Sequence, residues 1–484
     1  MATSEKDDEN EEEDNDKDNK EKTIIEALLR WGEENGIETH PRVQVVTSSA
    51  REDEERGVFY VHHEQNDQND KKNDDEDNNA DEEEVVPLVS IPEKALLCVR
   101  RPITTGVKIT REREEEEEEE EEDDALCQLL LTEIKKDRTS FWSAYISTLP
   151  NDYDLLELWT DEEIEELQVE SSKVVARELR RELHSSYDRQ CKTEKKKSYS
   201  WEEWSFAKAT VRSRTVSVPW SSAGALAPVG DMFNYAPVGG FLNDDDDGDK
   251  KDGSLPVGTG VWNEKKNAFE FRGALPKIEL SASRSFELFM NYGAYTNLEL
   301  LSLYGFHCGQ NNPNDVIVLN VPEIKKKTTE EYRAKVISTS GALTFESERD
   351  LRLEYAVISS YTRGTDKRAQ RTHMASQRHS FSAFASRGEK LNNESERNFC
   401  TAVRDAAGRA LLSFATTAKQ DCDLLEELLL TNTEEEQATS ADSTSSRRRR
   451  RRKLAIEYRL AVKRALQKTY RLYEKRISMA SDSA

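Results

Sequence analysis

Long acidic runs constrain this sequence more than any other feature, because they divide it into separate stretches that can form a core. The longest is an unbroken glutamate run at 114–122, and other runs rich in Asp, Glu and Asn occupy 1–22, 65–84 and 243–253. Like charges repel and bury no apolar surface, so we predict disorder in these segments, with bounds of 110–124 for the second insertion. A chain of 484 residues still suffices for two or three domains, each with its own core.

The acidic runs give the chain a formal net charge of -26. This balance disfavours nucleic acid as a partner, because phosphate contacts need a positive surface. It suits a basic protein partner, although the simpler interpretation is that the runs remain solvated. The six cysteines show no Cys-x-x-Cys spacing, so we expect neither a zinc site nor a redox pair, and no metal.

The N-terminal residues lack the apolar region of a secretory signal and the composition of a transit peptide. No stretch of 18 or more apolar residues exists, so we expect no contact with a membrane. These features predict a cytoplasmic or nuclear protein, and we expect it to be a monomer.

Periodic patterns predict where helices and strands lie. Thr23 is expected to cap a helix that ends near Gly36, because Glu26 completes a capping box. Helical patterns dominate from about 125 to 183, whereas 201–306 reads as short strands and tight turns. Helical patterns return beyond 323. They are interrupted by a polar, arginine-rich insertion at 432–452, which is interpreted either as a nuclear localisation signal or as a flexible segment.

Three segments carry the residues of chemical interest: Val211–Thr215, Val229–Tyr235 and Leu288–Phe306. The third contains a short strand, a turn at Gly293 and a helix that starts near Asn297. Tyrosines flank that helix. Taken alone, the simplest interpretation is that both are buried tyrosines with satisfied hydroxyls.

Together, the segments resemble the SET domain, in the branch typified by the Rubisco large-subunit methyltransferase. That branch carries Asp-x-x-Asn-His, then Tyr-Gly, Asn-x-Glu-Leu-Leu and Tyr-Gly-Phe in this order. The matching stretches here are Asp231–Tyr235, Tyr292-Gly293, Asn297–Leu301 and Tyr304–Phe306. Weaker similarity runs over about 23–475.

The resemblance implies an α+β protein. A β-rich SET catalytic domain at 23–309 would contain a pseudoknot and the helical insertion 101–205. An all-helical substrate-binding domain would follow at 310–484. The implied activity is transfer of methyl groups from S-adenosyl-L-methionine to lysine side chains of a protein substrate.

The resemblance also implies roles for individual residues. The catalytic tyrosine of the family matches Tyr292. Residues in the places that shape the target-lysine channel are Ser213, Asp231 and Tyr304. Residues in cofactor-binding places are Glu54, Arg56, Gly57, Arg214, Asn234 and Tyr235.

Some positions depart from the family pattern. Tyr235 replaces the usual histidine, the N-terminal turn has the single glycine Gly57, and Ser283–Glu287 replaces the usual Lys/Arg-x-Gly-Glu. These departures keep open the alternative of a SET-fold interaction module without catalysis. A protein-histidine methyltransferase with the same fold is the other alternative.

Overall fold

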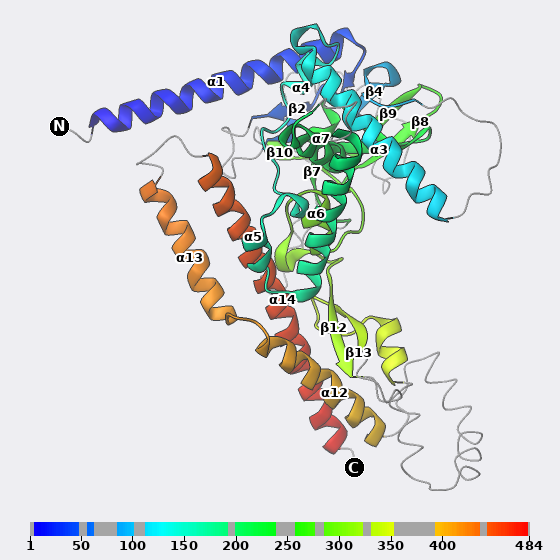
Figure 1. Ribbon diagram of the computed structural model, residues 1–484, viewed down its shortest axis with the longest axis vertical. Helices are drawn as coiled ribbons and strands as arrows, with labels where there is room; N and C mark the ends of the chain where they lie inside the picture. The colour runs from blue at the N-terminus through cyan, green and yellow to red at the C-terminus, as the bar shows by residue number, and fades with distance from the viewer. Residues whose placement is uncertain are drawn as a thin grey trace, which may run out of the picture. The chain divides into compact units, whose positions relative to one another are not determined.

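The computed structural model describes residues 4–47, 56–61, 85–100, 112–191, 199–238, 257–275, 285–322, 331–352, 393–435 and 443–482. The chain divides into two compact units, which we describe separately (Figure 1). Unit 1 comprises Met1–Tyr153, Arg181–Phe241 and Asp245–Ala294, and unit 2 comprises Asp154–Arg180, Leu242–Asp244 and Tyr295–Ala484.

Unit 1 contains the short strands that its sequence predicts. They pair in the orders β1-β4-β9-β8 and β10-β3-β2, and as the pairs β11-β7 and β5-β6. The strands are β1 (Glu38–Thr39), β2 (Val43–Val46), β3 (Gly57–Val61), β4 (Val85–Pro92), β5 (Thr215–Val218), β6 (Ser221–Leu226), β7 (Asn234–Tyr235), β8 (Thr259–Asn263), β9 (Ala268–Ala274), β10 (Ser285–Glu287) and β11 (Phe289–Met290).

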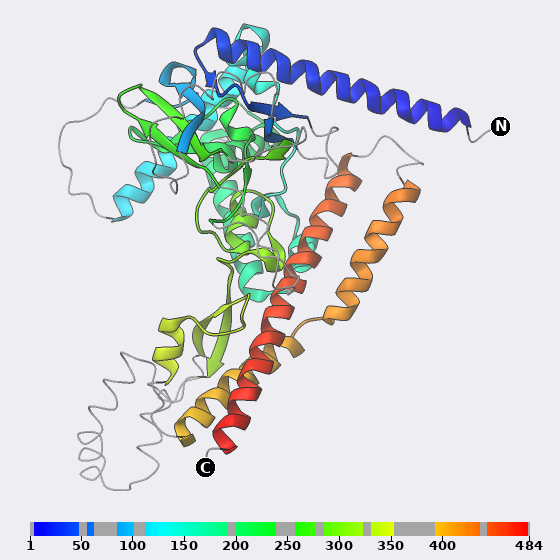
Figure 2. The same cartoon turned by 180° about the vertical axis from the view of Figure 1, so that it is seen from behind.

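The strand β4 forms the middle of the largest sheet. It pairs antiparallel with β9, which in turn pairs with β8, so the blue strand β4 lies beside the green strand β9 in Figure 2. The side chains of Leu88, Val89 and Ile91 are at most 1% exposed, so this strand is covered on both faces. An apolar run buried on both faces is what the sequence Val85–Pro92 predicts.

The segment 288–291 is threaded among strands that are distant in sequence. The amide of Leu288 donates to the carbonyl of Val58 at 2.8 Å, and the amide of Gly258 donates to the carbonyl of Phe289 at 2.8 Å. The strand β11 also pairs in parallel with β7. A Cβ at Gly258 would lie 2.6 Å from the carbonyl oxygen of Arg272, so only glycine fits this crossing. The α+β class and the threaded segment predicted from the resemblance are confirmed.

The helices of unit 1 precede and follow the first strands. Short 3₁₀ helices lie at Glu93–Ala95, Asp137–Thr139 and Gly230–Met232. The helices are α1 (Ser4–Glu34), α3 (Glu112–Lys135), α4 (Ser143–Ile146), the end of α6 (Glu170–Cys191) and α7 (Trp201–Arg214).

The helix α1 begins at Ser4 instead of Thr23, so the predicted disorder at 1–22 is wrong for residues 4–22. Thr23 lies within the helix, and its hydroxyl donates to the carbonyl of Asn19 at 2.7 Å. The buried residues Ile25 and Leu28 anchor the C-terminal half. Once the C-terminal half of a helix is anchored, each residue added at its N-terminal end gains one backbone hydrogen bond. Glu and Lys also have high intrinsic helix propensities.

The predicted disorder of the insertion 110–124 is also wrong for residues 112–124, because α3 begins at Glu112 and includes the glutamate run 114–122; residues 110 and 111 lie outside the described residues. Glu122 is 9% exposed and accepts hydrogen bonds from the amide and hydroxyl of Ser222, both at 2.7 Å. Asp124 is 1% exposed and lies 3.0 Å from the ammonium of Lys208. Burial raises the pKa of Asp124, but the charge and hydrogen bond of Lys208, together with hydrogen bonds from Ser186 and Arg189, outweigh burial and hold the pKa below its ordinary value.

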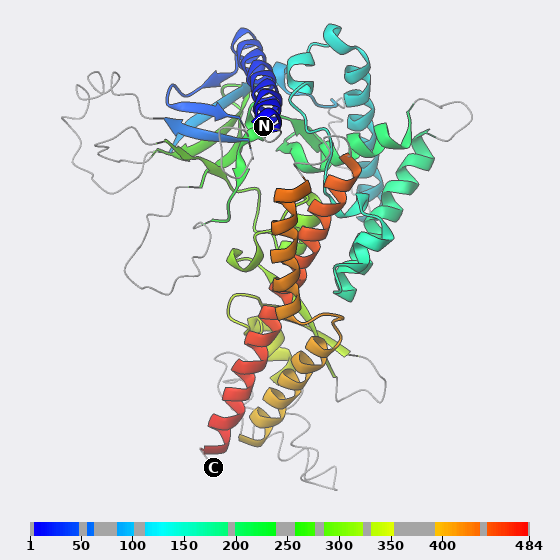
Figure 3. The same cartoon turned by 90° about the vertical axis from the view of Figure 1, so that its left-hand side faces the viewer.

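Unit 2 is mainly helical, as predicted, but 310–484 also contains a β-hairpin that the sequence analysis missed. Its strands β12 (Val316–Pro322) and β13 (Glu331–Ile337) pair antiparallel. Figure 3 shows α12 and α13 packed along α14, the long red helix. The helical elements are Leu156–Leu158 and Gly309–Asn311, both 3₁₀, with α5 (Asp161–Glu165), the first part of α6, α8 (Asn297–Leu303), α12 (Asn393–Leu412), α13 (Ala418–Glu435) and α14 (Ser443–Asp482).

The segment 154–180 contributes to the core of unit 2, although the sequence placed it in the helical insertion. Trp159 and Ile164 are at most 1% exposed and pack in one cluster with Val336 of the hairpin and Val403 of α12. The contacts of these apolar side chains, and not the sequence order, group this segment with the C-terminal part of the chain.

The arginine run belongs to α14, so its interpretation as a flexible insertion is wrong for 443–452. Arg451 is 4% exposed, and its guanidinium lies 3.1 Å from carboxylate oxygens of both Asp154 and Glu163. Arg448 remains 69% exposed. The role of the run as a nuclear localisation signal stays a prediction.

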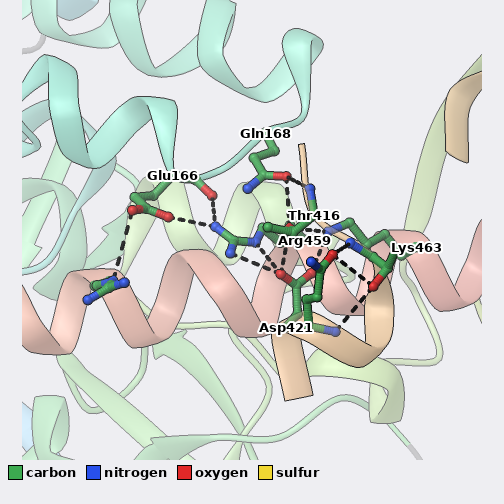
Figure 4. Close-up of polar contacts among 9 residues, drawn as sticks. Glu166, Gln168, Thr416, Asp421, Arg459 and Lys463 are labelled. Atoms are coloured by element: carbon green, nitrogen blue, oxygen red, sulfur yellow. Dashed lines mark hydrogen bonds and ion pairs between the residues drawn. The ribbon is translucent and has the colours of Figure 1, made fainter. Parts of the chain in front are cut away.

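A buried cluster of charges ties α14 to the start of α13 (Figure 4). Asp421 is 0% exposed; its carboxylate lies 2.9 Å from the guanidinium of Arg459 and also pairs with the ammonium of Lys463. Arg459 reaches Glu166, ahead of α6, at 2.7 Å. Burial raises the pKa of Asp421, but hydrogen bonds from Arg459 and Lys463 outweigh it and lower the pKa.

His307 follows the Tyr304–Phe306 stretch and is held as a neutral imidazole. Its Nδ1 accepts a hydrogen bond from the amide of Gly309 at 3.1 Å, so its proton lies on Nε2, which is 3.1 Å from the carbonyl of Leu454. Burial lowers the pKa of His307 from 6.5 to about 4, and the Leu454 carbonyl only partly opposes this shift.

We expect His307 to destabilise unit 2 in acid. Between its ordinary pKa of 6.5 and about 4, the unfolded chain binds a proton that the folded protein does not. The free energy of unfolding should therefore fall by about 2–3 kcal/mol as the pH drops through this window. Urea titrations at pH 7 and pH 4 should show this loss in the wild type and a smaller loss in His307→Gln. Equal losses in both would contradict the prediction.

Within the described residues, no helix combines the length and the apolar content that crossing a membrane requires.

Candidate active site

The segment Asp231–Tyr235 forms the centre of the site in unit 1. It follows a strained turn, because Val229 has φ 71° although its side chain is β-branched and 1% exposed. Gly230 comes next, and a Cβ there would lie 2.0 Å from the ring of Phe271. The buried Val229 side chain and the close contact of Gly230 with Phe271 thus fix the backbone that leads into β7.

Arg214 and Asp231 form a buried ion pair. Arg214 is the last residue of α7, a helix that Ser200 and Glu203 start with a capping box. Its Nη1 lies 3.1 Å from Oδ2 of Asp231 and 3.2 Å from the carbonyl oxygen of the same residue. Burial lowers the pKa of the Arg214 guanidinium, but the combined contributions of Asp231, Tyr153 and Tyr145 outweigh burial and raise the pKa above its ordinary value.

Two polar atoms of this pair remain unused. Arg214 Nε and Asp231 Oδ1 are buried, and neither makes a hydrogen bond to another residue in the described part of the chain. Buried polar atoms without a partner are uncommon, and a bound ligand is one explanation. The Nε–H group fits a carboxylate such as the one in the methionine part of S-adenosylmethionine. The residues present therefore fit the cofactor that the resemblance implies.

Asn234 is the first residue of β7, and its side-chain amide donates two hydrogen bonds. One Nδ2 hydrogen bond goes to the carbonyl of Arg56 at 2.9 Å and the other to Oε1 of Glu287 at 2.7 Å. The amide oxygen remains as its acceptor for a ligand. Arg56 contributes its backbone here, because its side chain bonds the carbonyl of Thr148 at 2.8 Å and the carboxylate of Glu21 at 3.0 Å.

The remaining part of the predicted N-terminal turn is only partly described. Gly57 is the buried first residue of β3, directly after Arg56. Glu54 lies outside the described residues. The cofactor roles of all three stay predictions.

Tyr292 directly follows the threaded segment 288–291 and contacts the segment Asp231–Tyr235. Its hydroxyl donates to the carbonyl of Phe233, and its ring centroid lies 5.4 Å from that of Tyr235. The hydroxyl of Tyr235 in turn donates to the carbonyl of Gly293 at 3.2 Å. Arg214 and Tyr292 thus both contact the stretch Asp231–Tyr235, which itself includes Asn234.

Of the three residues predicted to shape the target-lysine channel, only Asp231 lies in the site described above. The hydroxyl of Ser213 donates within α7 to the carbonyl of Ala209 at 2.7 Å. Tyr304 belongs to unit 2, where its ring lies 5.8 Å from Tyr295 and 6.0 Å from Phe306. Their roles toward a substrate stay predictions.

The sequence analysis assigned no role to Glu287 or Tyr145, although both touch the site. Glu287 holds the Asn234 amide, and the hydroxyl of Tyr145 donates to Oδ2 of Asp231 at 2.8 Å. Glu287 occupies the place of the glutamate in the family's Lys/Arg-x-Gly-Glu stretch, and that position was the available signal.

Replacing Glu287 with alanine should weaken binding of S-adenosylmethionine by about tenfold, because one charge-assisted hydrogen bond of about 1.5 kcal/mol fixes the Asn234 amide. Calorimetric titration measures the change. Glu287→Gln keeps an acceptor oxygen and should lose less affinity than Glu287→Ala. If both variants bind as tightly as the wild type, Glu287 does not orient Asn234.

Among the described residues, no group of three or more His, Cys, Asp or Glu side chains is arranged to hold a metal ion.

Comparison with known proteins identifies the class of fold. Residues 355–466 match the family described as Rubisco LSMT substrate-binding. A crystal structure of the SET domain of LSMT bound to lysine and AdoHcy is similar with a TM-score of 0.57 and 17% identity, over 95% of this chain and 93% of that chain. Rubisco LSMT bound to AdoMet is similar with a TM-score of 0.55 and 16% identity, with the same coverage. The chain therefore has the fold of these SET-domain proteins.

Two curated proteins are similar over part of their length. Protein SET DOMAIN GROUP 40 of Arabidopsis thaliana is 31% identical over 242 residues, which span 48% of this chain and 49% of that protein. SET domain-containing protein 4 of Artemia parthenogenetica is 28% identical over 219 residues, which span 44% of this chain and 50% of that protein. The matches thus cover about half of each relative. The resemblance to the SET-domain branch with a Rubisco LSMT substrate-binding domain, predicted from the motifs, is confirmed.

Proposed function

We propose that this protein transfers methyl groups from S-adenosylmethionine to lysine side chains of a protein substrate. The observation that carries the proposal is that Arg214 and Tyr292 both bond to the segment Asp231–Tyr235, which itself contains Asn234. The solved structures with the same fold include one bound to AdoMet and one bound to lysine and AdoHcy. They support the same pairing of cofactor and target.

The residues of the site have separate tasks toward the cofactor. When bound, S-adenosylmethionine supplies an electrophilic methyl group on a positively charged sulfur. Arg214 binds its carboxylate through Nε, the buried donor that has no partner among the described residues. Asn234 accepts a hydrogen bond through its amide oxygen, since both of its amide protons are already used.

Tyr292 has the task of aligning the target amine. A lysine is a nucleophile only when neutral, yet its ordinary pKa is near ~10.4. The aromatic rings of Tyr292 and Tyr235 provide apolar surroundings that disfavour the ammonium form, so that its proton can leave to water. The Tyr292 proton is directed at the Phe233 carbonyl, so the phenol presents a lone pair to the amine and the methyl group. Alignment of two bound reactants then supplies most of the acceleration.

The target is proposed to be a protein, presented by unit 2. The match of residues 355–466 to a substrate-binding family supports this assignment. The buried charge cluster and the apolar core give this unit the rigid frame that a binding surface needs.

The test combines cofactor binding with identification of the product. Purified full-length protein is titrated with S-adenosylmethionine in a calorimeter and is then incubated with a lysate and radiolabelled cofactor. Binding followed by labelled methyl-lysine in the hydrolysed product supports the proposal. Absence of binding would indicate an interaction module without catalysis, and labelled methyl-histidine would replace the lysine assignment.

A further inference from the structure

Tyr235 and Tyr292 are joined by two reciprocal hydrogen bonds to the backbone. The hydroxyl of Tyr292 donates to the carbonyl of Phe233, two residues before Tyr235. The hydroxyl of Tyr235 donates at 3.2 Å to the carbonyl of Gly293, the residue directly after Tyr292. The two ring centroids lie 5.4 Å apart, and the ring planes are tilted by 52°. Each tyrosine thus bonds the backbone close to the other one.

The backbone around Tyr292 needs such a contact, because regular structure ends just before it. The strand β11 ends at Met290, and the stretch 292–294 belongs to no helix or strand. Gly293 in this stretch has φ 152°, and glycine loses more conformational freedom on folding than any other residue. The hydrogen bond from Tyr235 therefore restricts backbone rotation directly after Tyr292.

Tyr235 is itself held in place, so it can fix a neighbour. It pairs with Met290 in the parallel pair of β7 and β11, and the amide of Ala236 donates to the Met290 carbonyl at 3.1 Å. Its side chain is 5% exposed. A buried phenol needs a hydrogen-bond partner in place of water, and the Gly293 carbonyl provides one. The histidine that is usual at this position has a shorter side chain, so the contact depends on the tyrosine.

We propose that Tyr235 is a positioning residue, whose hydroxyl holds Tyr292 in the orientation that methyl transfer requires. It acts through the Gly293 backbone and keeps the Tyr292 hydroxyl directed at the Phe233 carbonyl, with a lone pair toward the target amine. The inference rests on the proposed function, because that function gives Tyr292 the task of aligning the amine. It concerns the side chain of Tyr235 and is separate from the cofactor-binding place that this residue has in the family.

The experiment compares Tyr235→Phe with the wild type in the full-length protein. Phenylalanine keeps the ring and removes only the hydroxyl. At saturating S-adenosylmethionine, the initial rate of labelled methyl transfer to the proteins of a lysate should fall about five- to tenfold, the effect of one neutral hydrogen bond. The Kd for S-adenosylmethionine should be unchanged, because the hydroxyl contacts the Tyr292 side of the site.

A second readout reports the orientation of Tyr292 without catalysis. Tyrosines isotope-labelled at Cζ are observed by NMR, and the resonance of Tyr292 is identified by its loss in Tyr292→Phe. The chemical shift of Cζ depends on the hydrogen bonding of the hydroxyl. We expect this resonance to shift or broaden in Tyr235→Phe, since Tyr292 is no longer held in one orientation. A Tyr235 hydroxyl that only stabilises the fold would leave the resonance unchanged.

Tyr60→Phe is the matched control. Tyr60 is a buried tyrosine of the same unit, 2% exposed, whose hydroxyl accepts from Arg42 at 3.0 Å. This variant also loses one buried hydroxyl and should lower the unfolding temperature. It should leave the rate of transfer and the Tyr292 resonance unchanged.

The outcomes separate the proposal from the proposed function. Slower transfer in Tyr235→Phe, with an unchanged Kd and a changed Tyr292 resonance, supports the proposal. An unchanged rate or an unchanged resonance overturns it. A raised Kd overturns it as well, because the side chain then serves cofactor binding. If the wild type transfers no methyl group, the proposed function fails. The Tyr292 resonance then decides alone: a change in Tyr235→Phe supports the positioning contact, and no change overturns it.

Discussion

Replacing Tyr292 with phenylalanine should lower the rate of methyl transfer by about 10²–10³-fold, the loss seen when one fixed polar group is removed from a reacting centre. The change removes the phenol oxygen and its hydrogen bond to the Phe233 carbonyl but keeps the ring that faces Tyr235. Cofactor binding should be nearly unchanged, because the hydrogen bonds that hold Arg214 and Asn234 do not involve the Tyr292 hydroxyl.

The measurement is transfer of a radiolabelled methyl group to the substrate, with calorimetric cofactor titration in parallel. Tyr60→Phe serves again as the control, because it removes a buried hydroxyl elsewhere in unit 1 and should leave transfer intact. Equal labelling by the wild type and Tyr292→Phe would remove Tyr292 from the chemistry. Loss of both labelling and cofactor binding would instead indicate a disturbed site.

Replacing Asp421 with asparagine should produce the largest loss of stability. The change leaves Arg459, 1% exposed, and Lys463, 2% exposed, without the carboxylate that lies between them. Breaking a buried ion pair on one side costs about 3–5 kcal/mol, because a buried charge is left uncompensated. For a unit of this size the unfolding temperature should fall by roughly 6–15 °C.

The exposed pair between Arg448 and Glu162 is the matched control. Its oxygen and nitrogen atoms lie 2.9 Å apart, but the side chains are 69% and 79% exposed. Glu162→Gln should therefore change the free energy of unfolding by less than about 1 kcal/mol. Thermal unfolding of both variants measures the contrast. If Asp421→Asn is no less stable than Glu162→Gln, the cluster does not hold α13 and α14 together.

Local sequence signals predicted the elements that carry the site. The helix start near Asn297 is confirmed, and Thr296 and Glu299 form the capping box of α8. Apolar runs likewise predicted the buried strand β4. Such features depend on neighbours a few residues away, so the sequence contains the whole signal.

Contacts between residues that are distant in the sequence were not predicted correctly. The run of glutamates in α3 has the composition of a solvated segment, yet its last member, Glu122, is buried and accepts a hydrogen bond from Ser222. Shortly after the run, the buried Asp124 pairs with Lys208. Arg451 lies in a run of identical residues, and only its position on α14 places it against Asp154 and Glu163. Composition does not reveal which member of a charged run meets a partner.

The sequence by itself determined the class of fold, the order of the motifs and the identity of the chemical groups: a guanidinium, a carboxamide and a phenol. Only the tertiary structure decided that Tyr145 and Glu287 hold Asp231 and Asn234. It also decided that Ser213 bonds within its own helix. The physical reason is the distance along the chain between the groups that interact. Helix caps and turns are set by hydrogen bonds between near neighbours, whereas the orientation of a buried carboxylate or amide depends on donors and acceptors that folding brings from far along the chain.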